Sequence, residues 1–377
     1  MAISPQELTD IAYKISERFE KVNTYYLVLM AKQIKDIGKL DKDNIHRLRQ
    51  MAIMGNNIDS INSFLSLQTG LALNDIFELY MKSAIEEYKD VAYLYAYRGI
   101  KQPKFKENMA IQNYVESVRK LTSNTFENMA RTTVIAQSYK DTVDLAIDTV
   151  ATGIDDYQSV MRRMLIDKAV AGTKVMYASG ITRRLDSAAR MNILEGVRQI
   201  NMGVREETGK QYGADGVEID AHGLCAEDHL PYQGRQYSLR NYERLNNSLQ
   251  RPIGTCNCRH GISYIILGVS PKTYDNSELQ KMKDYSNAKI KIRDKECTRY
   301  QATQLMRQSE TNMRYQQDKI ITLKNAGMKY DKEEEKLKQM KKEYYYISKR
   351  AELKPRYDKA YAVSYTHLRA HETSQDL

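Results

Sequence analysis

The sequence predicts a mainly α-helical protein that carries one small α+β module, and three observations support this prediction. Apolar residues recur at intervals of three and four up to about residue 211 and again after residue 277, which is the spacing of a buried helix face. Between residues 213 and 271 lie seven of the 18 glycines and three of the six prolines. The same window contains two short stretches with the composition of β-strands.

Composition limits the class of protein. Charged residues make up 28% of the 377 residues, and the mean hydropathy is −0.63. No apolar run is long enough to cross a bilayer, and the polar N-terminal residues predict no secretory signal. The four cysteines do not have the pattern of a secreted disulfide framework. We therefore expect a soluble protein from a reducing compartment, with no membrane partner.

The net charge of +10 is unevenly distributed. Residues 1–270 contain 34 lysines and arginines against 32 acidic residues, whereas residues 271–362 contain 23 against 14. A basic C-terminal arm of this kind is typical of a segment that contacts nucleic acid or an acidic protein surface. A solvated helix that keeps the protein soluble is the alternative.

The helical N-terminal part begins with a clear capping pattern. Ser4 can cap the first helix, Pro5 occupies its first position, and Glu7 completes a capping box. We expect five to seven helices before residue 211, including a long one over residues 124–150. Breaks are predicted at Gly55, Pro103, Gly153, Gly172 and Gly180.

The turn-rich window predicts two or three strands, with residues 216–221 and 262–267 as the clearest. Pro271 ends the window, and helix resumes at Ser277. From there to about residue 360 the sequence predicts long charged helices with one interruption at Gly327. Residues 331–342 are predicted to form a solvated helix face that either packs against a partner or makes no contact.

These patterns predict four segments. Residues 1–175 form a helical region, residues 176–271 an α+β module, and residues 272–362 a basic helical arm. Residues 363–377 are unrelated to the helix before them and are interpreted as a non-native tail from sequencing-adapter read-through. His367 and His371 are therefore excluded as ligands.

The turn-rich window also concentrates metal-binding side chains. Cys256, Cys258 and His260 lie close together, and Cys225 and His229 precede them by about thirty residues. The C-x-C spacing is less typical of zinc than C-x2-C, so we expect no metal, with four weak candidates: Cys225, Cys256, Cys258 and His260. We also expect no cofactor.

A cysteine nucleophile with a histidine base, such as Cys225 with His229, can also be drawn. However, nearness in sequence supplies neither a positioned base nor an oxyanion site. The sequence has no Gly-rich phosphate loop, H-E-x-x-H or G-x-S-x-G motif. We therefore predict no catalytic residues and no enzyme.

Several separated motifs resemble the phage minor capsid protein family, which is allied to the portal-associated head-morphogenesis proteins of tailed bacteriophages. They are Ala221-His222, Asp228-His229, PYQGRQYS from Pro231, RPIGT from Arg251, Asn257-Cys258-Arg259-His260 and IILGVS from Ile265. The resemblance covers about residues 130–325, and Cys256 departs from the family pattern. The matching residues form either a binding site or a structural knot: His222, Asp228, His229, Gln233, Gly234, Asn257, Cys258, Arg259 and His260.

The resemblance implies a virion structural protein, a minor capsid component near the portal that acts in head assembly, DNA packaging or ejection. Its implied partners are the portal and other capsid proteins, with non-specific contact between the basic arm and packaged DNA. The implied location is the virion, and the host cytoplasm during assembly. The alternative is a Cys/His or metal-dependent hydrolase or transferase that acts in phage entry or maturation.

The two polar segments of the module, residues 222–229 and 256–260, are predicted to lie close together in the fold. We expect His222, His229, Cys258, Arg259 and His260 to converge, because both segments belong to one small module. Arg259 is expected to be buried and bonded to Asp228 or to carbonyl groups, since an unpaired buried guanidinium is strongly unfavourable.

Overall fold

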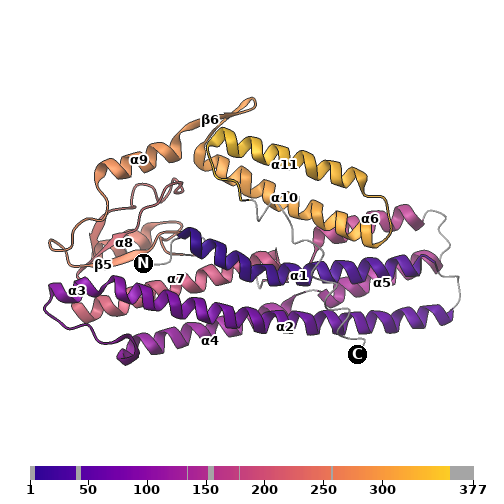
Figure 1. Ribbon diagram of the computed structural model, residues 1–377, viewed down its shortest axis with the longest axis horizontal. Helices are drawn as coiled ribbons and strands as arrows, with labels where there is room; N and C mark the ends of the chain where they lie inside the picture. Colours follow the sequence, from indigo (N-terminus) through magenta and orange to yellow (C-terminus); the bar gives the residue numbers. More distant parts are fainter. Residues whose placement is uncertain are drawn as a thin grey trace.

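The computed structural model describes residues 5–39, 44–133, 135–151, 157–177, 179–255 and 258–356. Within these residues the protein is mainly α-helical with three small antiparallel sheets, as the sequence predicts. Long helices lie side by side in a bundle, the largest sheet lies near one end of it, and two C-terminal helices lie along one side (Figure 1).

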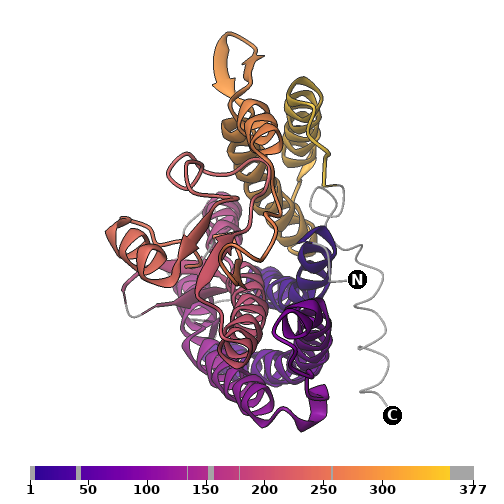
Figure 2. The ribbon, with the colours of Figure 1, turned by 90° about the vertical axis from the view of Figure 1, so that its left-hand side faces the viewer.

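The bundle is built from helices that run nearly along one axis (Figure 2). They are α1 (Pro5–Ile37), α2 (Asn44–Asp90), α4 (Met109–Thr132), α5 (Ile135–Ala151), α6 (Tyr157–Ala171) and α7 (Leu185–Tyr212). The short α3 (Ala92–Tyr97) and the 3-10 helix η1 (Phe105–Glu107) connect α2 to α4. The hairpin of β1 (Lys174–Met176) and β2 (Thr182–Arg184) connects α6 to α7.

Large aromatic side chains fill the centre of the bundle. Phe19 of α1 lies against Phe126 of α4 with ring centroids 5.6 Å apart, and Tyr26 of α1 meets Tyr139 of α5 edge-on at 6.0 Å. All four are fully buried, so each removes a large apolar area from water. The Tyr and Met stripes of the sequence therefore belong to a packed core.

The break predicted near Gly55 is wrong, because α2 continues from Asn44 to Asp90. Met54 and Ile61 are buried on the inner face of this helix. Asn57 donates a hydrogen bond from Nδ2 to Tyr139 Oη at 2.7 Å. Tertiary packing here outweighs the helix propensity of one glycine, which is unfavourable by about 1 kcal/mol.

The other predicted breaks have different outcomes. Pro103 lies between α3 and η1, and Gly172 and Gly180 have φ of +55° and +77°, so these three breaks are confirmed. Gly153 lies outside the described residues. The long helix predicted over residues 124–150 is wrong, because Thr133 is extended and bridges to Val175 of β1, which separates α4 from α5.

Gly196→Ala is expected to destabilise the protein, because α7 passes very close to α2 at this glycine. A Cβ atom at Gly196 would lie 1.6 Å from Tyr80 Oη. Tyr80 is fully buried and its hydroxyl is 3.0 Å from Thr122 Oγ1, so the ring cannot move away freely. We expect the free energy of unfolding to fall by about 1–3 kcal/mol, measured by urea denaturation.

Gly55→Ala is the matched control for this substitution. Nothing lies within 4 Å of a Cβ atom at Gly55, which is also in the middle of a helix. Here alanine should raise the unfolding free energy by about 0.5–1 kcal/mol, because it restricts the unfolded chain. Effects of the same sign and size at both glycines would contradict the close packing at Gly196.

Helix α7 packs within the bundle, and the strands of the predicted module follow it; we name residues 213–271 the α+β module. Its sheet has the order β4-β3-β5, with β3 (Gly216–Ile219), β4 (Gln236–Ser238) and β5 (Ile262–Ile265) all antiparallel to their neighbours. Two of these strands and their number agree with the sequence prediction. A ten-residue helix, α8 (Leu239–Ser248), follows β4. Val217, Ile219 and Ile262 pack beneath the sheet against Met202 of α7.

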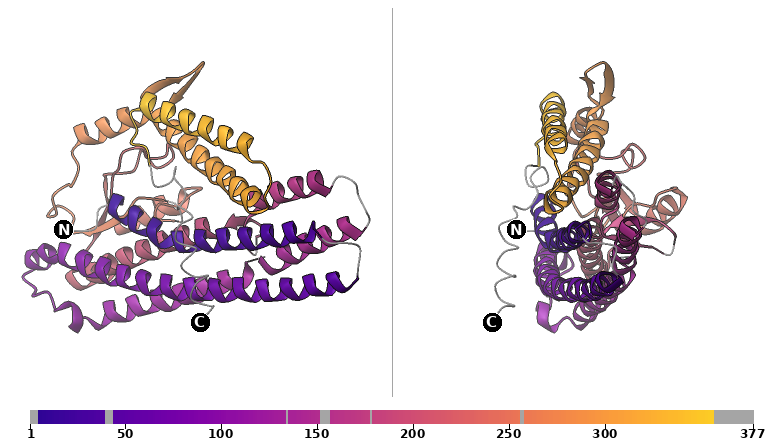
Figure 3. Two further views of the ribbon diagram at one scale, coloured as in Figure 1. Left: turned by 45° about the vertical axis from the view of Figure 1, so that its right-hand side comes forward. Right: turned by 90° about the vertical axis from the view of Figure 1, so that its right-hand side faces the viewer.

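The C-terminal part contains more than the helices predicted. It begins with α9 (Asn276–Asn287), whose N-cap Asp275 forms a capping box with Glu278. A hairpin of β6 (Lys289–Ile292) and β7 (Lys295–Thr298), which the sequence did not predict, follows it. Then α10 (Arg299–Asn325) and α11 (Asp331–Ala351) form a helical hairpin that turns at Gly327, whose φ is +72° (Figure 3).

The described part of the basic arm is not a free extension. Helix α10 packs against α1 and α6 of the bundle, and α11 packs against α10. Met313 of α10 and Tyr344 of α11 are fully buried between these helices. Residues 331–342, expected to meet a partner or lie free, thus have one face on α10, with Leu337 and Met340 packed against that core. Residues 363–377 lie outside the described residues.

A buried ion network joins α10 to the start of α7. Asp186 accepts hydrogen bonds from Arg184 Nε at 3.0 Å and from Arg314 Nη1 at 2.6 Å, and Arg184 also pairs with Asp318. The four side chains are at most 8% exposed. Burial alone would raise the pKa of Asp186, but the charges of Arg184 and Arg314 outweigh it and lower the pKa to about 2.

Glu20 of α1 adds a pH dependence to this network. Burial, followed by the negative charge of Asp186, raises the pKa of Glu20 from 4.5 to about 7. Between these two values the folded protein holds a proton that the unfolded chain has released, so the unfolding free energy falls as pH rises. Glu20→Gln should remove this fall and raise stability at pH 8 by on the order of 1–3 kcal/mol.

Denaturant unfolding across a pH series measures this effect. The wild-type and Glu20→Gln curves should approach each other as the pH falls below 4.5, where the wild-type carboxyl becomes protonated in both states. Glu78→Gln, an exposed carboxyl on α2, is the control and should leave the pH dependence unchanged. A pH slope that survives in Glu20→Gln would contradict the assignment.

Candidate functional site

The topology of the module brings its two polar segments together. Strand β3 is antiparallel to both neighbours, with Ile219 opposite Ile262 and Glu218 opposite Gln236. The chain therefore leaves β3, enters β4 and enters β5 at the same edge of the sheet. Residues 220–235, 249–255 and 258–261 belong to the loops at this edge, and these residues include His222, Cys225, His229, Cys258 and His260.

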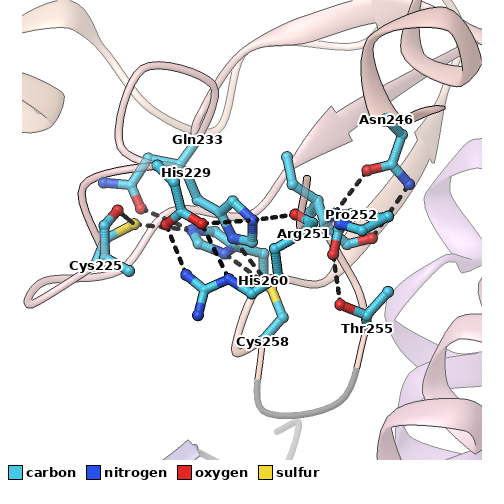
Figure 4. Close-up of polar contacts among 12 residues, drawn as sticks. Cys225, His229, Gln233, Asn246, Arg251, Pro252, Thr255, Cys258 and His260 are labelled. Atoms are coloured by element: carbon cyan, nitrogen blue, oxygen red, sulfur yellow. Dashed lines mark hydrogen bonds and ion pairs between the residues drawn. The ribbon is translucent and has the colours of Figure 1, made fainter. Parts of the chain in front are cut away.

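His260 lies at the centre of the cluster, between two thiols (Figure 4). Its Nδ1 is 3.2 Å from Cys258 Sγ, and its Nε2 is 3.4 Å from Cys225 Sγ and 3.1 Å from Gln233 Oε1. His229 Nδ1 is 3.6 Å from Cys258 Sγ, and His229 Nε2 donates to the carbonyl oxygen of Arg251 at 2.7 Å. We name His222, Cys225, His229, Cys258 and His260 the His/Cys cluster.

His222 joins the cluster through a tilted contact between its ring and that of His260. Its ring centroid is 4.5 Å from that of His260, and its Nδ1 is 2.9 Å from the carbonyl oxygen of Gly223. Its backbone N–H donates to Gln233 Oε1 at 3.2 Å, so Gln233 contacts two of the histidines. The buried Nε2 of His222 has no hydrogen-bond partner among the described residues.

The contacts confirm that His222, His229, Cys258 and His260 converge. The expectation for Arg259 is wrong, because its side chain is exposed and Asp228 pairs with Arg251, at 2.6 Å from Nη2. Gly234 has φ of +69°, and its N–H donates to the carbonyl of Ile219 at 2.7 Å, so its role is in the turn. Cys256 and Asn257 lie outside the described residues.

Sequence reasoning missed Arg251 as a member of this site. It contributes its carbonyl to His229 and its guanidinium to Asp228. The signal available in the sequence was the Arg-Pro step that opens the turn at residues 251–254, because a proline fixes the backbone beside it.

Burial favours the neutral forms of His260 and Cys225. Burial, followed by the charges of His222 and His229, lowers the pKa of His260 to about 3. Burial raises the pKa of Cys225 to about 12. A nucleophilic cysteine requires a lowered pKa and access to substrate, whereas Cys225 is 1% exposed. These properties do not favour the cysteine nucleophile.

Two surface hollows among the described residues lie away from the cluster. One is bordered by β6, β7 and the start of α10, and the other by α8 with Tyr232 and Tyr237. No member of the His/Cys cluster borders either hollow. Among the described helices, none has an apolar stretch that could span a bilayer.

The described residues form a helical bundle with a small module that carries a largely buried His/Cys cluster. Residues 3–346 match the family model described as phage minor capsid protein 2, and the chain therefore belongs to this family. The match begins well before residue 130, where the sequence resemblance began. No curated protein and no solved structure matches the chain. Membership in this family supports a structural role in the virion, with other capsid components as partners.

Proposed function

We propose that this protein is a minor component of the virion near the portal vertex, where it acts in head assembly, DNA packaging or ejection. The observation that carries the proposal is the match of nearly the whole chain to a minor capsid family. Assembly would take place in the host cytoplasm.

The partner surface that we propose is the outer face of α11. This face carries exposed basic residues with acidic residues between them: Lys332, Glu334, Glu335, Lys336, Lys338 and Lys342. Mixed charge favours an oppositely patterned protein surface over a phosphate backbone, which the carboxylates repel. Several other basic side chains of the arm are already paired within the protein, including Arg314 and Arg356. A portal or capsid protein therefore suits this face better than DNA.

Quantitative proteomics of purified particles tests the location. We expect the protein in mature particles at a low copy number relative to the major capsid protein, and depleted from particles assembled without portal. Absence from purified particles, with the protein abundant in the infected-cell lysate, would overturn the proposal and favour a hydrolase or transferase that acts outside the virion.

The competing DNA contact is tested by filter binding of full-length protein to random duplex at two salt concentrations. Removal of residues 272–362 is unsuitable, because it would leave Arg184 buried without Asp318. Substitution of Lys336, Lys338 and Lys342 by glutamine leaves the buried face of α11 intact. Weak binding that this variant does not change supports a protein partner. Tight, steeply salt-dependent binding that the variant loses establishes the DNA contact.

A further inference from the structure

Three atoms of the His/Cys cluster that could bind a metal ion lie close together: His229 Nδ1, Cys258 Sγ and His260 Nδ1. The sulfur lies 3.6 Å from His229 Nδ1 and 3.2 Å from His260 Nδ1, and the ligand atoms of the three residues all lie within 4.8 Å of one another. Around a tetrahedral zinc ion a cysteine sulfur and a histidine nitrogen are about 3.6 Å apart, given the usual bond lengths. The spacing of these atoms thus suits zinc without rearrangement of the backbone.

The other nitrogens of the two histidines are already held by oxygen atoms. His229 Nε2 donates to the Arg251 carbonyl at 2.7 Å, and His260 Nε2 lies 3.1 Å from Gln233 Oε1. With a proton on each Nε2, both Nδ1 atoms keep a lone pair directed at Cys258. Histidines that bind metals are oriented in this way, by a carbonyl or carboxyl oxygen at the second nitrogen.

We propose that His229, Cys258 and His260 bind a zinc ion, with the Arg251 carbonyl and Gln233 as its outer partners. A thiolate with two imidazoles is a set of ligands that binds zinc in preference to magnesium, calcium or manganese. The side chains of His229 and His260 are 2% and 3% exposed, so the ion would be largely shielded from solvent, which suits a structural role. The ion ties the loop after β3 to the loop before β5.

The loop after β3 also carries a second set of possible ligand atoms, which lies on the Nε2 side of the His260 ring and is separate from the site at Nδ1. Cys225 Sγ is 3.4 Å from His260 Nε2, and His222 Nε2 is buried without a partner among the described residues. His222, Cys225 and His260 form a second set of ligand atoms within 4.8 Å of one another. The C-x-C spacing that argued against metal in the sequence is not used, since Cys258 acts with histidines from both loops and Cys256 lies outside the described residues.

Elemental analysis of the full-length protein, purified without chelator, tests the proposal. We expect one zinc per chain in the wild type. After exchange into cobalt, a thiolate-to-cobalt charge-transfer band and intense visible bands should report tetrahedral coordination by sulfur. Cys258→Ser should lose both the metal and the charge-transfer band. Cys297→Ser is the matched control, because Cys297 lies in β7 outside the cluster, and it should retain both.

Far-ultraviolet circular dichroism of each variant should show that the helical bundle stays folded, since the helices far outweigh the module in the signal. Chelation should lower the melting temperature of the wild type and leave that of Cys258→Ser unchanged. A wild-type protein that takes up neither zinc nor cobalt would overturn the proposal. Cys225→Ser should retain the metal, because Cys225 lies on the Nε2 side of His260. Metal retained in Cys258→Ser would overturn this ligand assignment, whatever the result for Cys225→Ser.

Discussion

Asp186→Asn is expected to lower the free energy of unfolding by about 3–5 kcal/mol, the range for removing one partner of a buried ion pair. Asp186 accepts hydrogen bonds from Arg184 and Arg314 and is 6% exposed. The asparagine amide has nearly the same size but carries no charge, so two buried guanidinium groups would share only Asp318 and Glu20 nearby. The substitution therefore weakens a contact that holds α10 against the bundle.

Urea denaturation at pH 7 measures this loss, with Glu116→Gln as the control. Glu116 pairs with Arg119 on the surface of α4, where both side chains are well exposed. Removing that pair should change stability by at most about 1 kcal/mol. Limited proteolysis gives a second readout, because α10 and α11 should become sensitive in Asp186→Asn before the rest of the bundle. Equal effects of the two substitutions would show that the network does not hold α10 in place.

The fold class and the main elements could be predicted because local signals and tertiary packing agree over most of the chain. Pro5 does begin α1, and the alternating residues from Gly216 and the β-branched residues from Ile262 do form strands. Gly327 does interrupt the C-terminal helices. At each of these positions the residue type has a backbone preference that the fold also requires.

Predictions failed where packing between distant segments decides the outcome. Gly55 lies within α2 because neighbouring buried residues hold the helix together, and α4 ends at Thr132 because Thr133 pairs with Val175, more than forty residues away. The ion network shows the same limit. Arg184 and Asp318 are ordinary charged residues in the sequence, and only the packing of α10 on the bundle makes them a buried pair.

The candidate site shows a similar division. The convergence of His222, His229, Cys258 and His260 could be predicted, because both segments belong to one small sheet and adjoin the same edge. The partner of Asp228 could not, because Arg251 and Arg259 both lie in the loop before β5 and only the path of that loop decides between them. The zinc geometry likewise depends on ring orientations that no spacing rule contains.

Arg205→Met is expected to lower the free energy of unfolding by about as much as Asp186→Asn, because Arg205 links the helical bundle to the α+β module. Arg205 of α7 donates from Nε to Glu87 of α2 at 2.5 Å and from Nη1 to Asp220 of the module at 2.8 Å. Glu87 is 8% exposed, so loss of the guanidinium leaves a carboxylate buried without a counter-charge. We expect the unfolding free energy to fall by about 3–5 kcal/mol, measured by urea denaturation.

A second substitution separates charge from packing. Adding Glu87→Gln to Arg205→Met should recover part of the loss, because a neutral amide needs no buried cation and the methionine keeps most of the apolar contact. Lys210→Met is the control on the same helix: Lys210 pairs with Glu206 and Glu207 but is 60% exposed, so its removal should change stability by at most about 1 kcal/mol. If the double variant is no more stable than Arg205→Met, the lost unfolding free energy comes from packing around Arg205. The buried charge of Glu87 would then not explain how the module is held to the bundle.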